Sequence, residues 1–201
     1  MESAPRHQCL IYDGAPSQQL PALAALMRER LRQNYRVLYL NSPAMLAEMR
    51  AILWTASVNV GAELAKGRLV LSAERPHLIE DRFDAALMMQ LLEDALHDAL
   101  HAGYAGLWAS GDMTWEMGPD PDFQKLVEYE WRLENFFAAH PQLAGICQYH
   151  IDTLPREVLR QGLVMPPGIF VSETLQLVNP EFVNARRLTA AMRQNPGAGS
   201  A

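Results

Sequence analysis

Short β-type runs alternate with longer helical patterns along the chain, and this alternation limits the possible folds more than any other feature. Strands are expected at residues 7–12, 36–40 and 68–72, in the apolar run that follows Gly103 and ends at Asp112, and at 143–150, 169–171 and 175–178. Apolar residues at helical spacing predict helices at 21–34, 43–54, 84–102 and 122–139, with a short helix from residue 155 and a last one at 184–193. Strands separated by such helices indicate parallel β-α-β crossovers. We therefore expect an α/β fold of three layers, with a mostly parallel central sheet and a C-terminal β pair.

Several helix ends carry recognisable signals. Ser42 is a good N-cap residue, and Pro43 after it is favoured at the first position of a helix. Either Asp81 or Asp84 can begin the helix that runs to residue 102, and Gly103 is placed to end it.

The length and composition of the chain fit one domain. It has 201 residues, of which 49% are hydrophobic, and this is enough for a single core. We expect this domain at residues 7–183. A C-terminal helix and flexible tail are expected at 184–201, where the last letters, P-G-A-G-S-A, are too small and polar to pack.

Charge and hydropathy exclude several classes of protein. A net charge of −6 leaves no broad basic surface, so direct nucleic-acid binding is not expected. The sequence has no signal peptide and no apolar run near the roughly 20 residues of a membrane span, so we expect a cytoplasmic protein without membrane contact. Cys9 and Cys147 lie in separate apolar runs without a metal-binding spacing, which favours buried, reduced thiols.

Ligands of open parallel sheets bind beyond the carboxyl ends of the strands, so the loop after the first expected strand is informative. It reads D-G-A-P-S-Q-Q-L from residue 13, with one glycine and no lysine, whereas a phosphate-binding loop requires G-x-x-x-x-G-K-[ST]. This argues strongly against P-loop ATP hydrolysis. Tyr12, at the tip of the same strand, is a candidate ligand contact.

The strand that ends at Asp112 supplies a second group of candidates. Asp112 can cap the following helix or form a turn, contact a ligand, or hold magnesium, and the missing phosphate loop makes magnesium the weakest of these interpretations. Met113, Trp115 and Met117 can form an adaptable apolar wall beside this acid. The alternative is that Trp115 only packs over the edge of the core.

The helix expected at 122–139 contains three further residues of interest. Tyr129 lies on its apolar stripe. Glu130 and Glu134 are four residues apart, a pattern typical of a solvated face, and a site role for Glu130 is the alternative.

The tip of the strand 143–150 also carries polar groups. Gln148 and Tyr149 can orient a ligand there or can satisfy the loop backbone. The chain has no nucleophile elbow such as G-x-S-x-G and no paired metal-ligand spacing. We therefore predict no catalytic residue, no metal site and no cofactor.

Together these motifs resemble the MEDS family, the sensory domain named for methanogens, methylotrophs and the dichloromethane-responsive regulator. The resemblance spans about residues 7–180 and rests on H-Q-C-L-I-Y, A-G-Y-A-G-L-W-A-S-G-D-M-T-W, V-E-Y-E and I-C-Q-Y-H. Carried onto this chain, the family pattern implies nine site residues: His7, Asp112, Met113, Trp115, Tyr129, Glu130, Cys147, Gln148 and Tyr149. For His7, a purely structural hydrogen bond is the alternative interpretation.

The resemblance implies a RecA/KaiC-like core without a phosphate loop and a non-catalytic role in sensing small organic or hydrocarbon-derived molecules. We expect the ligand at the carboxyl ends of the strands, walled by Trp115 and Tyr149 and oriented by Asp112 and Gln148. The implied output is transcription or a kinase. No output module follows Val183, so we expect a partner regulator or a longer chain, and apolar helix faces would favour a homodimer. The competing function is a degenerate RecA-like nucleotide-binding protein or ATPase.

Overall fold

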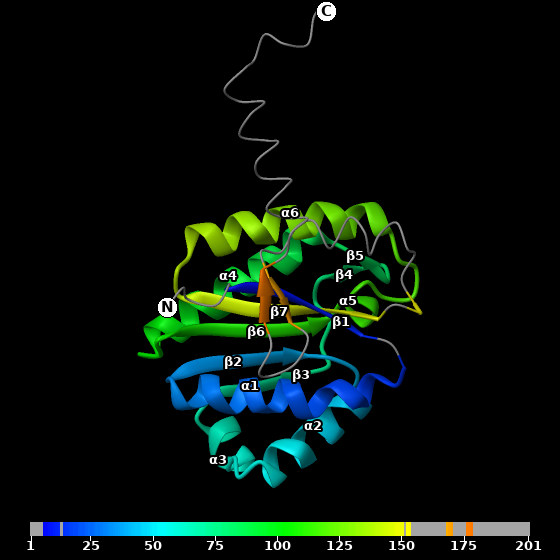
Figure 1. Cartoon of the computed structure of the whole chain (residues 1–201). Helices are drawn as coiled ribbons and strands as arrows, with labels where there is room; N and C mark the ends of the chain where they lie inside the picture. Colours follow the sequence, from blue (N-terminus) through cyan, green and yellow to red (C-terminus); the bar gives the residue numbers. More distant parts are fainter. Residues whose placement is uncertain (1–5, 13, 151, 154–167, 171–175, 179–201) are drawn as a thin grey trace, which may run out of the picture.

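A computed structural model of the chain describes residues 6–12, 14–150, 152–153, 168–170 and 176–178 (Figure 1). Its strands are β1 (His7–Tyr12), β2 (Tyr35–Leu40), β3 (Leu69–Ser72), β4 (Leu78–Ile79), β5 (Arg82–Phe83), β6 (Gly106–Asp112), β7 (Leu143–His150), β8 (Gly168–Phe170) and β9 (Gln176–Val178). Its helices are α1 (Leu20–Arg32), α2 (Pro43–Thr55), α3 (Val60–Ala65), α4 (Ala85–His101), α5 (Met113–Glu116) and α6 (Phe123–Ala139), with a short 3-10 helix η1 (Pro16–Gln19). The helices expected near residue 155 and at 184–193, and the tail after them, lie outside the described residues.

One sheet of seven strands organises the molecule, in the order β3-β2-β6-β7-β1-β8-β9. Neighbouring strands are parallel except for β8 and β9, which are antiparallel. The carboxyl ends of β2, β6, β7 and β1 therefore share one edge of the sheet. The predicted α/β class, the mostly parallel sheet and the C-terminal β pair are confirmed.

Helices cover both faces of this sheet and make three layers (Figure 1). On one face, α1 and α2 pack over a core that includes Leu23 and Ile146, and on the other, α4 and α6 pack over a core that includes Leu92 and Cys147. We call these the α1 face and the α6 face. Ile146 and Cys147 belong to different cores because successive residues of a strand point to opposite faces. No helix of the described residues is both long and apolar enough to cross a membrane.

The expected helix boundaries are confirmed at three positions. Ser42 accepts a hydrogen bond from the backbone nitrogen of Met45 at 3.4 Å and caps α2. Asp84, and not Asp81, caps α4 by accepting from two backbone nitrogens at 2.9 Å. Gly103 follows α4 with a φ of 82°, a conformation that glycine adopts without strain.

The sequence patterns did not predict the small antiparallel pair of β4 and β5, nor α3, and they indicated α5 only through the helix cap considered for Asp112. Asp81 lies in the turn between β4 and β5, where its φ is 63°. Aspartate tolerates this left-handed conformation better than most residues. These elements are only two to six residues long, which is too short for a hydrophobic period to be visible.

Asp112 has two structural roles at the carboxyl edge of the sheet. Its Oδ1 accepts hydrogen bonds from the backbone nitrogens of Thr114 and Trp115 at 3.0 and 3.1 Å, and so caps α5. Its Oδ2 accepts a 2.7 Å hydrogen bond from the hydroxyl group of Tyr12, which joins β6 to β1 across β7. Burial raises the pKa of Tyr12, and the Asp112 charge raises it further, so the hydroxyl stays protonated and donates.

Gly145 lies where β6, β7 and α6 approach too closely for a side chain. A Cβ atom at this position would lie 2.4 Å from the backbone oxygen of Ala109 and 3.2 Å from Cζ of Phe137. The backbone oxygen belongs to the neighbouring strand and cannot move away without disturbing the sheet.

We expect Gly145→Ala to lower the free energy of unfolding by about 1 to 3 kcal/mol, because the added methyl group overpacks this contact. Urea unfolding measures the change. Gly61→Ala in α3 is the matched control, since the nearest atom to its Cβ lies at 3.9 Å and alanine favours a helix. The control should be neutral or stabilising, and a Gly145→Ala variant as stable as the parent would contradict the packing.

We expect Asp112→Ala to lower the free energy of unfolding by about 2 to 4 kcal/mol, since it removes both a helix cap and a charged hydrogen bond. Asp112→Asn retains an oxygen that can cap α5 and should lose less. Urea unfolding of the two variants at neutral pH makes the comparison. Equal stability of Asp112→Ala and the parent would show that neither contact stabilises the fold.

Candidate functional site

The ten predicted site residues do not lie around one pocket, and the structure divides them between the two faces of the sheet. Gln148 and Tyr149 are neighbours on β7 and therefore point to opposite faces. The residues on the α1 face, near the carboxyl edge, are Tyr12, Asp112 and Gln148. The residues on the α6 face are His7, Met113, Tyr129, Glu130, Cys147 and Tyr149, and Trp115 packs at the margin of the same core.

The polar atoms at the carboxyl edge are already engaged within the protein. Gln148 Nε2 donates to Ser110 Oγ at 2.9 Å, and Ser110 in turn donates to the backbone oxygen of Ile146 at 2.9 Å. Asp112 is occupied by α5 and Tyr12. The arrangement expected from the sequence, in which Gln148 and Tyr149 enclose one ligand, is corrected by the alternation of side chains along β7.

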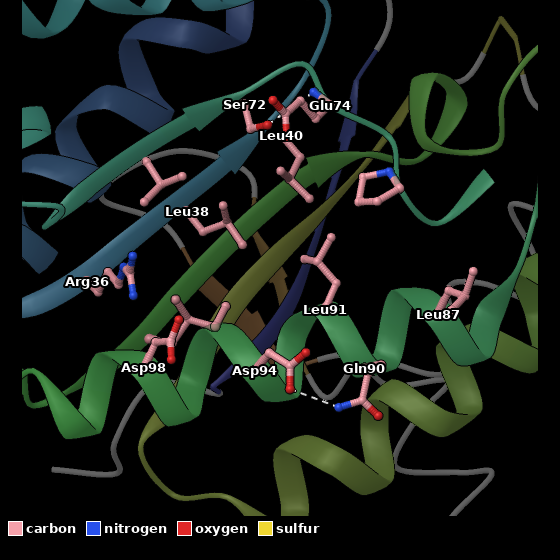
Figure 2. Close-up of a pocket in the computed structure, with 14 residues that line it drawn as sticks. Arg36, Leu38, Leu40, Ser72, Glu74, Leu87, Gln90, Leu91, Asp94 and Asp98 are labelled. Carbon is pink, nitrogen blue, oxygen red and sulfur yellow. Dashed lines mark hydrogen bonds between the residues drawn. The ribbon is translucent and has the colours of Figure 1, made fainter.

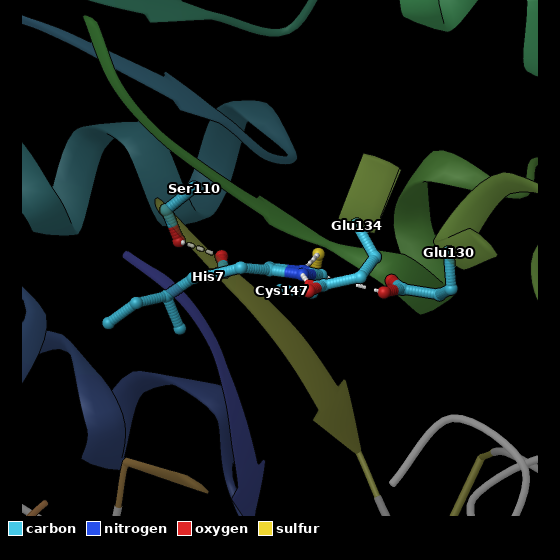
Figure 3. Close-up of polar contacts among 6 residues, drawn as sticks. His7, Ser110, Glu130, Glu134 and Cys147 are labelled. Atoms are coloured by element: carbon cyan, nitrogen blue, oxygen red, sulfur yellow. Dashed lines mark hydrogen bonds and ion pairs between the residues drawn. The ribbon is translucent and has the colours of Figure 1, made fainter. Parts of the chain in front are cut away.

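On the α6 face, four polar residues form a buried cluster that we call the His7 cluster: His7, Glu130, Glu134 and Cys147 (Figure 3). His7 begins β1, Cys147 lies in β7, and the two glutamates are one turn apart on α6. His7 Nδ1 lies 2.9 Å from Glu134 Oε2, whereas Nε2 lies 3.5 Å from Glu130 Oε2 and 3.7 Å from Cys147 Sγ. A helix and two neighbouring strands thus meet at one imidazole ring.

The position of the His7 ring is fixed on two sides. The ring stacks on Phe137, with centroids 4.5 Å apart and planes 5° apart. A carboxylate 2.9 Å from Nδ1 favours the tautomer that carries its proton on Nδ1, because that nitrogen can then donate to Glu134. The lone pair of Nε2 then faces Glu130 and Cys147. The structural role considered for His7 is present at both ring nitrogens, because Nε2 also contacts Cys147 Sγ and Glu130 Oε2.

Glu130 is fully buried, with an exposed fraction of 0%, and the expected solvated face of α6 is therefore wrong. Neither of its carboxylate oxygens accepts a hydrogen bond from the part of the chain that the structure describes. Removing a carboxylate from water without such partners is costly. Glu134 is also buried, with an exposed fraction of 7%.

Burial and the negative charge of Glu130 also raise the pKa values of neighbouring side chains. Burial raises the pKa of the Cys147 thiol well above its usual value, and the Glu130 carboxylate raises it further. The same two causes raise the pKa of Tyr149, and a contact of its hydroxyl group with the Glu130 carboxylate adds to them, although the two groups are not placed for a regular hydrogen bond. Burial raises the pKa of Cys9 to about 12. Both cysteines are free and buried, as the sequence predicts.

A small cavity of about 30 Å³ adjoins the His7 cluster, and its lining includes Met113, Glu116, Tyr129 and Cys147. This volume is enough for about one water molecule. Glu116 is fully buried, and burial raises its pKa, although His77 close to its carboxylate acts in the opposite direction. Met113, Tyr129 and Cys147 are predicted site residues, whereas Glu116 is an acid that the sequence did not indicate.

A larger hollow, of about 460 Å³, lies between α4 and the strands β2 and β3 (Figure 2). Leu38 and Leu91 contribute apolar surface to it, and Arg36 and Asp98 contribute charges. None of the predicted site residues lines this groove.

The sequence contained a signal that the α6 glutamates are buried, whereas Glu116 and His77, which were not predicted, had none. Leu126, Glu130, Leu133 and Phe137 follow one another at the spacing of a buried helix face, so Glu130 occupies a core position in the repeat. Glu116 ends α5 and His77 lies directly before β4, and their separation in sequence predicts no contact.

Comparisons with known proteins agree with this architecture. Residues 6–164 match the family model described as methanogen/methylotroph, DcmR sensory domain, or MEDS. The chain is 27% identical over 146 residues to the transcriptional repressor DcmR of Methylorubrum extorquens, in an alignment that covers 72% of this chain and 52% of the repressor. The chain thus spans about half the length of that relative.

A solved structure shows the same fold at low sequence identity. The flagellar accessory protein FlaH from Methanocaldococcus jannaschii is similar with a TM-score of 0.55 and 14% identity, over 83% of this chain and 70% of FlaH. This similarity identifies the RecA-like fold. Because the family model covers most of the chain, the chain belongs to the MEDS family of sensory domains.

Proposed function

We propose that this domain senses a small organic molecule without catalysing a reaction, and that it controls a transcriptional or kinase output. Its place in a family of sensory domains and its similarity to a transcriptional repressor support a regulatory role. The observation that carries the proposal is the set of buried polar atoms on the α6 face that have no hydrogen-bond partner among the described residues. These include the carboxylate oxygens of Glu130 and the hydroxyl oxygen of Tyr149.

The α6 face is a better ligand site than the carboxyl edge, because it retains hydrogen-bonding capacity. At the edge, Asp112 and Gln148 are bonded to protein groups. On the α6 face, Glu130 has only a 3.5 Å ion-pair contact with His7, and neither Glu130 nor Tyr149 makes a regular hydrogen bond to the described residues, so both can bond a ligand. Apolar side chains such as Met113 surround them, so the site suits a small, mostly apolar molecule with one or two polar groups.

The size of the cavity couples binding to a movement of the helices. This space of about 30 Å³ holds little more than one water molecule and is not lined by Glu130 or Tyr149, so a ligand that reaches these two residues requires α6 or α4 to shift. A ligand that binds the shifted form more tightly increases its population. Trp131 on α6 has an exposed fraction of 49%, so a shift of α6 would change a surface that an output partner can contact.

The segment between β1 and α1 supports a non-catalytic role. Its single glycine, Gly14, uses its carbonyl oxygen to accept a 2.7 Å hydrogen bond from His150 Nε2. The 3-10 helix that follows begins with Pro16, which has no N–H group to offer a phosphate. A cradle of successive backbone amides, which binds triphosphates in P-loop proteins, is not built by these residues.

A thermal-shift screen of small alcohols, aldehydes and halogenated hydrocarbons tests the proposal. We expect a compound that stabilises the parent to bind Glu130→Gln or Tyr149→Phe about 10- to 150-fold more weakly, since each variant loses a strong hydrogen bond to the ligand. Isothermal titration calorimetry measures the affinities. Gln148→Ala, on the opposite face of the same strand, is the matched control and should bind normally.

The opposite pattern of affinities would show that the ligand binds elsewhere. A ligand that is lost in Gln148→Ala but retained in both α6-face variants would place the pocket at the carboxyl edge. Phosphate release with magnesium and ATP should stay at background. Turnover that disappears in Asp112→Asn would refute the non-catalytic role and favour a degenerate ATPase.

A further inference from the structure

We propose that His7, Glu130 and Cys147 bind a divalent transition-metal ion, and that zinc is the best match. The ion site shares Glu130 with the proposed ligand site, but either a metal ion or an organic ligand can bind in the absence of the other. The residues come from β1, α6 and β7, so no short sequence spacing reveals them.

The ligand atoms of the three residues already have the separations that a metal requires. All lie within 4.8 Å of one another. His7 Nε2 is 3.5 Å from Glu130 Oε2 and 3.7 Å from Cys147 Sγ. Tetrahedral zinc, with its usual bonds to nitrogen, oxygen and sulfur, holds neighbouring ligand atoms about 3.3 to 3.6 Å apart. Small side-chain adjustments are therefore enough to accommodate the ion.

The surroundings of His7 match those of a metal-ligating histidine. Such histidines usually bind the metal through one ring nitrogen and donate the other N–H to a carboxylate or carbonyl group. Here Glu134 lies 2.9 Å from Nδ1, and Phe137 stacks against the ring. Both contacts direct Nε2 toward Glu130 and Cys147. Glu134 is thus a positioning residue.

A divalent ion would resolve the unfavourable electrostatics of the site. Glu130 is fully buried, and its carboxylate oxygens receive no hydrogen bond within the described residues. On binding, the S–H bond of Cys147 breaks, a sulfur–metal bond forms, and the proton leaves to solvent. One carboxylate and one thiolate then balance the two positive charges of the ion, so the ion and its three ligands are together neutral, and Glu134 keeps its contact with the His7 N–H group.

The donor set selects the class of metal. Magnesium and calcium prefer oxygen ligands only, whereas nitrogen, oxygen and sulfur donors together suit zinc and neighbouring transition metals. Three protein ligands leave a fourth position open. Of these ligands, Cys147 also lines the neighbouring 30 Å³ cavity, which has room for about one water molecule.

Metal analysis of the untagged protein, produced with added zinc, tests the proposal directly. We expect about one zinc ion per chain by plasma mass spectrometry, as three ligands from one chain imply. Cobalt-loaded protein should show a thiolate-to-cobalt charge-transfer band. Cys9→Ala is the matched control, because the chain has two cysteines and this variant leaves only Cys147. It should retain the zinc and the cobalt band, and Cys147→Ala should lose both.

Glu134→Gln separates the positioning role from ligation. It keeps all three ligands but weakens the contact that orients His7, so we expect zinc affinity to fall about 10- to 100-fold while the cobalt band remains. Competition with a chromophoric chelator measures the affinity. Absence of stoichiometric metal and of the cobalt band in both the parent and Cys9→Ala would overturn the proposal, even if Cys147→Ala does not fold. An organic ligand that stabilises the metal-free protein would leave the proposed sensory function intact.

Discussion

A buried carboxylate that accepts no hydrogen bond from the described residues is the constraint on which the α6 face depends. Glu130 occupies a core position of α6, between the apolar residues Leu126 and Leu133 of the same stripe. Its burial costs free energy that an apolar residue at this position would not cost. Stability alone does not explain such a residue, whereas a ligand or an ion that becomes its partner does.

The contacts around Glu130 fix its environment in detail. Gly145 leaves room for Phe137 to approach the sheet, and Phe137 stacks on the ring of His7. His7 in turn contacts Glu134, one turn beyond Glu130 on α6. The helix is therefore tied to β1 and β7 by apolar packing and by one imidazole. A change at the His7 cluster acts directly on the position of α6, which suits a sensor.

Sequence patterns predicted most of the fold because the long elements repeat their apolar residues regularly. The strand–helix alternation, the caps at Ser42 and Asp84 and the glycine after α4 all appear as expected. The candidate residues were identified largely through the family motifs, but their grouping was not. Side-chain alternation along β7 separates Gln148 from Tyr149, and pairs such as His77 and Glu116 meet only in three dimensions.

The most direct test is the stability of Glu130→Gln in the absence of metal and organic ligand. If Glu130 is present for binding, replacing it with a neutral residue of the same shape removes a buried charge and should leave the protein at least as stable as the parent. Urea unfolding of chelator-treated protein at neutral pH gives the comparison. A loss of several kcal/mol in Glu130→Gln would show instead that the carboxylate holds the fold together, and would contradict a functional role for the His7 cluster.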